Sequence, residues 1–177
     1  MKNEKVTGII LSQKALFEKD KRIEIFTKSE GKKTALAKYA NTKSFRFSGK
    51  LEPTNHVELI LYKGRSFDII TQCTCLEHFS QIRNDFNKIA LACYFIDIIR
   101  KTTAFNQANP NLFYLLLEGL STLHTTNTPI QSIKTQFQNH FLKLEGLHKT
   151  NTSHTDSQFE EIIHHYSGHP LKAPSFI

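Results

Sequence analysis

The segment from Lys32 to Lys50 combines cations with aromatic rings and contains no acidic residue. Lysine and arginine neutralise the phosphates of nucleic acids and release their counterions, while aromatic rings stack on unpaired bases. The segment is therefore a candidate nucleic-acid-binding surface. The alternative is a solvated basic loop whose aromatic side chains pack into a core. The cations are Lys32, Lys33, Lys38, Lys43, Arg46 and Lys50, and the aromatic residues are Tyr39, Phe45 and Phe47.

Alternation along this segment would place Phe45 and Phe47 on one face and Arg46 on the other. We therefore expect the cations to contact phosphates and at least one of the two phenylalanines to anchor the loop in the core. Four phosphate contacts on a single strand would give a log–log salt slope of roughly −3. The segment shows no pattern for reading base edges, so sequence-independent binding is expected.

The distribution of charge supports an anionic partner for the N-terminal half. The chain of 177 residues has a net charge of +7. Residues 1–80 hold 15 Lys and Arg against 9 Asp and Glu, whereas residues 81–177 hold 8 against 7. Basic surfaces of this kind favour nucleic acid or a membrane surface.

Five short segments with alternating apolar residues predict strands in the first 75 residues or so. They are residues 6–12, 22–27, 34–39, 57–62 and 67–73. So many short strands favour a small closed barrel or a sandwich, because an open sheet would leave exposed edges. The one long connection, residues 40–54, holds most of the basic and aromatic segment, and long structured loops are often functional.

From about Ser80 the apolar residues recur at helical spacing. One helix is predicted around residues 82–100, and Asn109-Pro110 and Thr128-Pro129 each give a start signal for another. Three helices with short connections predict a helical bundle or cap. Residues 150–157 read as a polar linker, residues 158–166 as about two helical turns, and the end as an extended tail.

The sequence gives no positive support for catalysis, because it lacks the common phosphate-loop, dinucleotide, zinc-protease and nucleophile-elbow motifs. Asp97 lies in an apolar helix, where a structural contact is the favoured interpretation. The histidines His164, His165 and His169 are interpreted as exposed side chains rather than a zinc site. We therefore expect no enzyme activity, no cofactor and no metal.

The cysteines and apolar runs indicate where the protein works. Cys73, Cys75 and Cys93 are few and poorly spaced for disulfides, which fits a reducing compartment. The longest apolar stretch, residues 89–99, is interrupted by Asp97 and is too short to span a bilayer. We expect a soluble, cytoplasmic and nucleoid-associated protein without a membrane partner.

Two runs of the sequence, VTGIILSQ and KRIEIFTKSEGKKTALAKYANTKSFRFSGKLEPTNHVELILYKG, resemble the N-terminal barrel of the bacterial recombination mediator family RecO. The family has a strand similar to GIVL, then E-x-D-x-x-x-x-x-F-T-x-x-x-G, and later A-K-G, K-S and L-x-P. Tyr39 stands where the family prefers glycine, and Asn41 where a basic residue is usual. KIALACYFIDII and NLFYLLLEGLSTL also resemble the family's helical domain. The matching residues are Glu18, Asp20, Phe26, Thr27, Gly31, Ala37, Lys38, Lys43, Ser44, Leu51 and Pro53.

The resemblance implies an OB-fold barrel joined to a helical domain. Proteins of this family bind single- and double-stranded DNA, anneal complementary strands and help load recombinase onto DNA coated with single-strand-binding protein. Their partners are RecR and the acidic C-terminal tail of single-strand-binding protein, which docks on the helical domain. Most members carry a four-cysteine zinc module after the LxGL helix. Here no cysteine follows Cys93, so zinc is not expected.

Together these observations predict an α+β protein, with a five-stranded OB-fold barrel in residues 1–79, an α-helical domain in 80–149 and a linker with a short helix or tail in 150–177. The leading hypothesis is a non-enzymatic, DNA-binding and annealing recombination mediator. The alternatives are a protein-interaction adaptor and a sequence-independent RNA-binding OB protein. The expected DNA-binding residues are Lys33, Lys38, Tyr39, Lys43, Arg46 and Lys50. By charge alone, the candidates for binding the partner tail are Arg100, Lys101 and Lys134.

Overall fold

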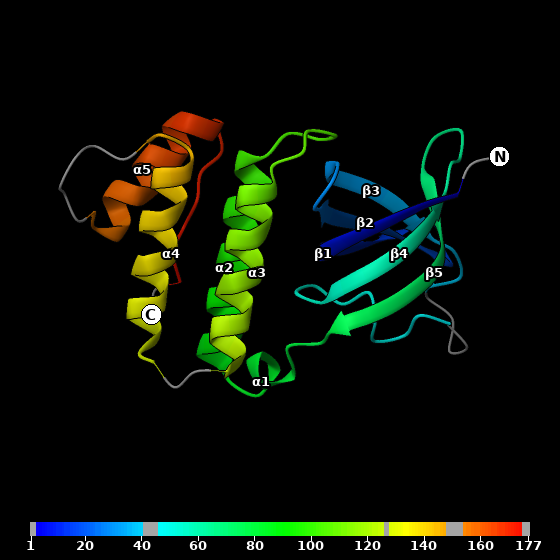
Figure 1. Cartoon of the computed structure of the whole chain (residues 1–177), viewed down its shortest axis with the longest axis horizontal. Coiled ribbons are helices and arrows are strands. Elements are labelled where there is room, and N and C mark those ends of the chain that lie inside the picture. Colours follow the sequence, from blue (N-terminus) through cyan, green and yellow to red (C-terminus); the bar gives the residue numbers. More distant parts are fainter. Residues whose placement is uncertain (1–2, 41–45, 126–127, 148–153, 175–177) are drawn as a thin grey trace. The chain divides into compact units, whose positions relative to one another are not determined.

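The computed structural model describes residues 3–40, 46–125, 128–147 and 154–174, which form two compact units. The first unit comprises residues 1–78 together with 104–110, and the second comprises 79–103 and 111–177. Figure 1 shows strands in the first unit and helices in the second. This is the α+β layout that the sequence predicts.

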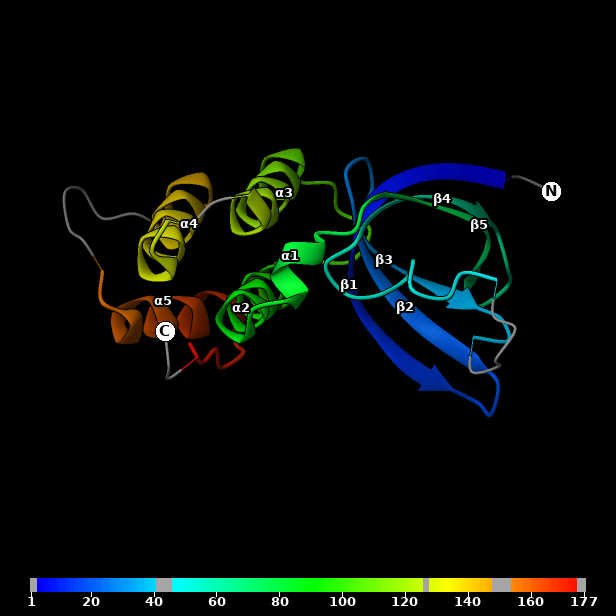
Figure 2. The same cartoon turned by 90° about the horizontal axis from the view of Figure 1, so that it is seen from below.

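The first unit is a closed barrel with the strand order β1-β2-β3-β5-β4, visible end-on in Figure 2. Neighbouring strands are antiparallel, except that β3 and β5 are parallel. Closure gives every strand a neighbour on both sides, although β3 and β5 pair at only two positions. The five predicted strands and the OB-like barrel are confirmed. The strands are β1 (Asn3–Leu16), β2 (Asp20–Thr27), β3 (Gly31–Ala37), β4 (His56–Tyr62) and β5 (Asp68–Glu77).

The barrel core is built from the inward-facing residues of each strand, such as Ile25, Ala35 and Leu59. The connection between β3 and β4 adds Ala40, Phe47 and Leu51 to the same core. The burial of Phe47 confirms the prediction that one of the two phenylalanines anchors this connection; Phe45 lies outside the described residues.

Asn55 fixes the end of that connection against β1. Its buried side-chain amide donates hydrogen bonds to the carbonyl oxygens of Gly49 and Lys50, both at 2.9 Å. Its own carbonyl accepts from the Ile10 N–H at 3.0 Å, and the Thr54 N–H donates to the Ile10 carbonyl at 2.9 Å. These bonds satisfy backbone groups that burial would otherwise leave unpaired.

Residues 104–110 pack against the start of β3. The Asn106 N–H donates to the Lys32 carbonyl at 2.9 Å, and the Lys32 ammonium lies 4.6 Å from the centre of the Phe105 ring. Gly31 is required here, because its φ is +73° and a Cβ would lie 1.9 Å from the Gln107 carbonyl oxygen.

The second unit contains α1 (Ser80–Arg83), α2 (Phe86–Thr102), α3 (Pro110–Thr125), α4 (Ile130–Leu144) and α5 (Asp156–Ser167). Asp85 caps α2 by accepting from two backbone N–H groups, and Thr155 forms a capping box with Gln158 at α5. The three predicted helices are confirmed, and α3 begins at Pro110 as its start signal indicates. The segment expected to make two turns forms the 12-residue helix α5.

Small and aromatic residues join the helices of this unit. The rings of Phe95 on α2 and Phe137 on α4 stack with centroids 3.8 Å apart. Gly119 on α3 permits this packing, because a Cβ there would lie 2.9 Å from the Phe137 ring and 3.1 Å from Phe95. In the described part of the chain, no helix has the length and apolar character needed to cross a membrane.

Candidate nucleic-acid interface

The turn that follows β3 exposes one cation and one aromatic ring. Lys38 is exposed, and the Tyr39 side chain is 62% exposed with its backbone in the left-handed region at φ 58°. The Tyr39 N–H donates to the Asp20 carboxylate at 2.9 Å. Because Asp20 is the first residue of β2, this bond ties the end of β3 to the β1–β2 hairpin.

The β1–β2 hairpin places a second aromatic ring beside that turn. Leu16 pairs with Asp20, so residues 17–19 form the turn between the strands. Phe17 is 81% exposed and has φ 59°. The sequence analysis did not single out Phe17. The available signal was a lone phenylalanine among charged residues, between the first two predicted strands.

Cations outnumber carboxylates in the segments that carry these two rings. Lys14 and Arg22 lie opposite each other on β1 and β2, and both are exposed. In residues 14–22 and 38 there are five cations against Glu18 and Asp20, and Asp20 accepts from the Tyr39 N–H. The end of the barrel therefore presents exposed rings within a positive surface. We call Lys14, Phe17, Lys19, Arg22, Lys38 and Tyr39 the hairpin surface. Lys21 is half-buried, pairs with the core residue Ala37 and donates to the Gln13 side chain at 3.0 Å, so it is not included.

Arg46 and Lys50 lie on the β3–β4 connection and are tied to β5. The Arg46 guanidinium donates to the Thr71 carbonyl at 3.2 Å and lies 5.2 Å from the centre of the Phe47 ring. The Lys50 ammonium donates to the Cys73 carbonyl at 3.4 Å. Both groups have further N–H donors that can face a phosphate. Lys43 lies outside the described residues.

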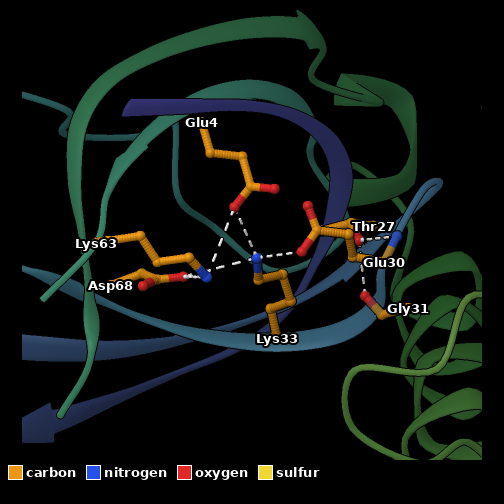
Figure 3. A network of polar contacts seen from close by, with 7 residues as sticks. All are labelled: Glu4, Thr27, Glu30, Gly31, Lys33, Lys63 and Asp68. Carbon is orange, nitrogen blue, oxygen red and sulfur yellow. Dashed lines mark hydrogen bonds and ion pairs between the residues drawn. The ribbon is translucent and has the colours of Figure 1, made fainter. Parts of the chain in front are cut away.

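Lys33, expected among the DNA-binding residues, points into the barrel instead of toward its surface. It pairs with Ile25 across β2 and β3 and shares the inward face of β3 with Ala35. Only 4% of its side chain is exposed. Figure 3 shows its ammonium among carboxylates of three different segments. This burial takes Lys33 out of the phosphate-binding set that we propose below.

Three carboxylates compensate the buried Lys33 ammonium. Its Nζ lies 3.0 Å from Glu4, 2.5 Å from Glu30 and 3.6 Å from Asp68. The more exposed Lys63 lies 3.5 Å from Asp68 and 3.9 Å from Glu4. A buried charge needs this kind of pairing, because desolvation alone would strongly disfavour it.

The pKa values of Lys33 and Glu4 shift in the direction that keeps both groups charged. Desolvation lowers the pKa of Lys33, but its hydrogen bonds to Glu30 and Glu4 outweigh this and raise the pKa above its ordinary value. A hydrogen bond with Glu30 lowers the pKa of Glu4, burial opposes that effect, and Lys33 lowers it further. These interactions therefore favour the charged forms of Lys33 and Glu4 in the folded barrel.

The three residues expected to bind a partner tail have different environments. Lys134 is fully buried, and its ammonium lies 2.7 Å from the Asp156 carboxylate. Arg100 and Lys101 are 30% and 27% exposed and pair with Asp97, which gives that residue a structural contact. Lys101 also donates to the Pro170 carbonyl at 2.6 Å. Of the three, only Arg100 and Lys101 are accessible to a partner.

A shallow cavity of about 100 Å³ lies between α3 and α4. Leu115, Ile133 and Phe137 form the apolar part of its lining, and Thr122 and Gln136 contribute polar side chains. Among its lining residues, only His140 can carry a positive charge, and Glu118 is negative. Arg100, Lys101 and Lys134 do not line this cavity.

The histidines and cysteines do not gather into a metal site in the described ranges. There, no group of three or more His, Cys, Asp or Glu side chains is placed to hold a metal ion. His164, His165 and His169 are exposed on and just after α5. Burial raises the pKa of Cys73 to about 11, so its thiol stays protonated near neutral pH.

Comparison with known proteins finds two family models that match consecutive parts of the chain. The model for the N-terminal region of recombination protein O matches residues 1–79, and the model for its C-terminal region matches residues 83–170.

Individual relatives carry the name DNA repair protein RecO. The chain is 31% identical to the one from Alkaliphilus metalliredigens over 150 residues, which cover 84% of the chain and 61% of the relative. It is 30% identical to that of Acetivibrio thermocellus, covering 73% and 52%, and 29% identical to that of Desulforamulus reducens, covering 91% and 63%. The matches thus span between about half and two thirds of the length of these relatives.

Proposed function

Since the chain belongs to the RecO family of recombination and DNA repair proteins, we propose that it is a non-enzymatic mediator that binds single- and double-stranded DNA and anneals complementary strands. The barrel is the DNA-binding unit. The helical unit receives the acidic tail of single-strand-binding protein, and the protein works with RecR to assist recombinase loading.

The observation that carries this proposal is the hairpin surface. Exposed cations and two exposed aromatic rings lie together at one end of an OB-like barrel, where the β1–β2 loop and the strand 2–3 face are common nucleic-acid-binding elements. Arg46 and Lys50 extend the set of cations onto the β3–β4 connection, and Lys43 is proposed to join them.

Annealing by such a surface requires no chemical step. Lysine and arginine side chains neutralise phosphates of two strands, and the reduced repulsion lets complementary bases meet and pair. Base pairing then supplies the free energy, so no nucleotide hydrolysis is needed. Exposed cations on long, mobile side chains suit this role because they contact backbones of any sequence.

For the partner tail, we propose that its apolar side chains occupy the cavity between α3 and α4. An acidic tail needs an apolar pocket and a nearby cation. The cavity supplies the pocket, and His140 in its lining is the candidate for the cation. Arg100 and Lys101 on α2 do not line the cavity and remain separate candidates for contact with the acidic residues of the tail. Changing Gln136 and Thr122 to Glu should weaken binding of a peptide with the tail's sequence, whereas changing Arg100 to Glu tests the α2 cations separately.

The DNA-binding proposal is tested with a charge-reversal variant, Lys14→Glu/Lys19→Glu/Lys38→Glu. All three side chains are exposed, so the barrel should fold normally. Affinity for both single-stranded and duplex oligonucleotides should fall at least roughly tenfold at low salt, and the salt slope for single strands should decrease by about 2. Fluorescence anisotropy measures both.

A matched control carries the same change of charge elsewhere, in Lys28→Glu/Lys143→Glu/Lys172→Glu, whose side chains are also exposed. It should keep DNA affinity within about threefold, the residual effect of net charge alone. Equal loss in both variants would mean that total charge, and no particular surface, determines binding. No loss in either would favour the adaptor function, which binding of an acidic peptide would then test.

A further inference from the structure

We propose that Phe17 and Tyr39 act as a pair of stacking platforms for unpaired bases and make the barrel prefer single-stranded over double-stranded DNA. This inference rests on the proposed DNA-binding function of the hairpin surface. It assigns the recognition of unpaired bases to two rings, one of which the sequence pattern did not indicate.

The backbone of both residues is unusual for an aromatic side chain. Phe17 and Tyr39 have φ values of 59° and 58°, in the left-handed region that glycine and asparagine occupy most readily. Either turn could be made by those residues without the steric cost. Backbone strain of this kind clusters at binding sites, where the local conformation serves to aim a side chain.

Burial does not account for these rings. Phe17 is 81% exposed and Tyr39 is 62% exposed, so neither gains most of the stabilisation that an aromatic residue obtains in a core. The loop's anchoring role belongs to Phe47, which is 7% exposed. Neighbouring exposed apolar side chains rimmed by polar residues typically mark an interaction site.

Phe17 and Tyr39 lie on two turns of the barrel that both adjoin Asp20. β1 and β3 both pair with β2, and the Tyr39 N–H bonds to Asp20 at the start of β2. Strands two apart in a sheet are separated by roughly 10 Å, a distance that a few nucleotides of an extended single strand can span. One strand can therefore reach both rings.

The surrounding charges identify the occupant as a polyanion. Lys14 and Arg22 pair across β1 and β2, near the turn that holds both Phe17 and Lys19, and Lys38 directly precedes Tyr39. A basic groove combined with stacking rings is the usual arrangement for single-strand binding. A duplex keeps its bases stacked inside, so it can use the cations but not the rings.

The first test is the double variant Phe17→Ala/Tyr39→Ala, compared with Phe17→Tyr/Tyr39→Phe, which retains both rings. Affinity for a single-stranded oligonucleotide should fall roughly 10- to 100-fold in the alanine variant and be kept in the aromatic one. Affinity for a duplex of the same length should change by less than about twofold, because phosphate contacts remain. Circular dichroism checks that both variants are folded.

A second test uses the absence of tryptophan from the chain. In a Phe17→Trp variant the single indole reports on the site directly. Its fluorescence should be quenched by single-stranded DNA, but not by duplex or by a single strand that lacks bases.

The outcomes separate this inference from the function on which it rests. If the alanine variant loses single-strand and duplex affinity equally, or loses neither while Lys14→Glu/Lys19→Glu/Lys38→Glu loses both, the stacking role is overturned and DNA binding stands. If neither variant changes affinity, both proposals fail. Quenching of the indole by RNA alone would overturn the assignment to DNA.

Discussion

Lys33 and Lys38 show that the direction in which a lysine side chain points from its strand decides its role. Lys33 shares the inward face of β3 with Ala35 and Ala37, two small residues that leave space for a long side chain. Its ammonium reaches Glu4, Glu30 and Asp68. Lys38, just beyond the same strand, is exposed. Lys33 thus belongs to a structural network, whereas Lys38, five residues later, belongs to the proposed ligand surface.

Lys33→Met should lower the free energy of unfolding of the protein by about 3 kcal/mol, because the carboxylates would lose the cation that they share inside the barrel. Denaturant titration measures this loss. Lys63→Met, which removes a 58% exposed member of the same network, should cost less than about 1 kcal/mol. The folded Lys33→Met protein should bind DNA with unchanged affinity. A loss of DNA affinity without loss of stability would return Lys33 to the phosphate-binding set.

The lowered pKa of Glu4 predicts weaker stability in acid. The hydrogen bond with Glu30, and then Lys33, hold the folded-state pKa of Glu4 below its ordinary value of 4.5. Its contribution is therefore complete above that value and is lost as the pH falls through the lowered pKa. Unfolding of the Glu4→Gln variant, compared with wild type between about pH 6 and pH 3, should lack this part of the pH dependence. Parallel curves for the two proteins would contradict the assignment.

At the scale of elements, the pattern of apolar residues was sufficient to predict the strands and the three long helices. Val57, Leu59 and Leu61 recur at every second position, and Pro110 is a helix start signal. Both signals depend only on residues close together in the sequence, so they predict a strand and a helix without knowledge of the fold. The anchoring of the β3–β4 connection by Phe47 also followed from local alternation.

The parts that could not be predicted depend on residues far apart in the chain. The partners of Lys33 come from β1, the β2–β3 turn and the start of β5, so only the closed barrel brings them together. Lys134 likewise meets Asp156 from a different helix. The left-handed backbone that exposes Phe17 depends on hairpin geometry, for which its neighbours carry no glycine or asparagine signal.

The contact between α4 and α5 should depend on Asp156. Its carboxylate accepts from the fully buried Lys134 ammonium at 2.7 Å and from the Gln138 amide at 3.2 Å, and Gln138 also donates to Tyr94 on α2. Asp156→Asn would leave a buried cation without its counter-charge and should cost about 2 kcal/mol, a value reduced from that of a fully buried pair because Asp156 is 36% exposed. Denaturant unfolding checks this prediction. Asp97→Asn, at a more exposed pair, should cost under about 1 kcal/mol, and a similar loss in both variants would show that burial of Lys134 is not decisive.

At the scale of the whole molecule, net charge differs between the two halves of the chain, much as their secondary structure does. The barrel-forming half holds nearly all of the positive excess, whereas residues 81–177 have 8 cations against 7 anions. This division fits a protein in which one unit holds DNA and the other meets a protein partner. The chain belongs to the RecO family, which places this separation of charge in a protein of recombination and DNA repair.

The central claim is that the hairpin surface brings DNA strands together, and a strand-annealing assay tests it most directly. Two complementary oligonucleotides, with and without single-strand-binding protein, are mixed with wild type, Lys14→Glu/Lys19→Glu/Lys38→Glu or the control Lys28→Glu/Lys143→Glu/Lys172→Glu. Wild type and the control should accelerate annealing without nucleotide, and the hairpin variant should lose at least roughly tenfold of that acceleration. Equal annealing by the hairpin variant and wild type would contradict the account.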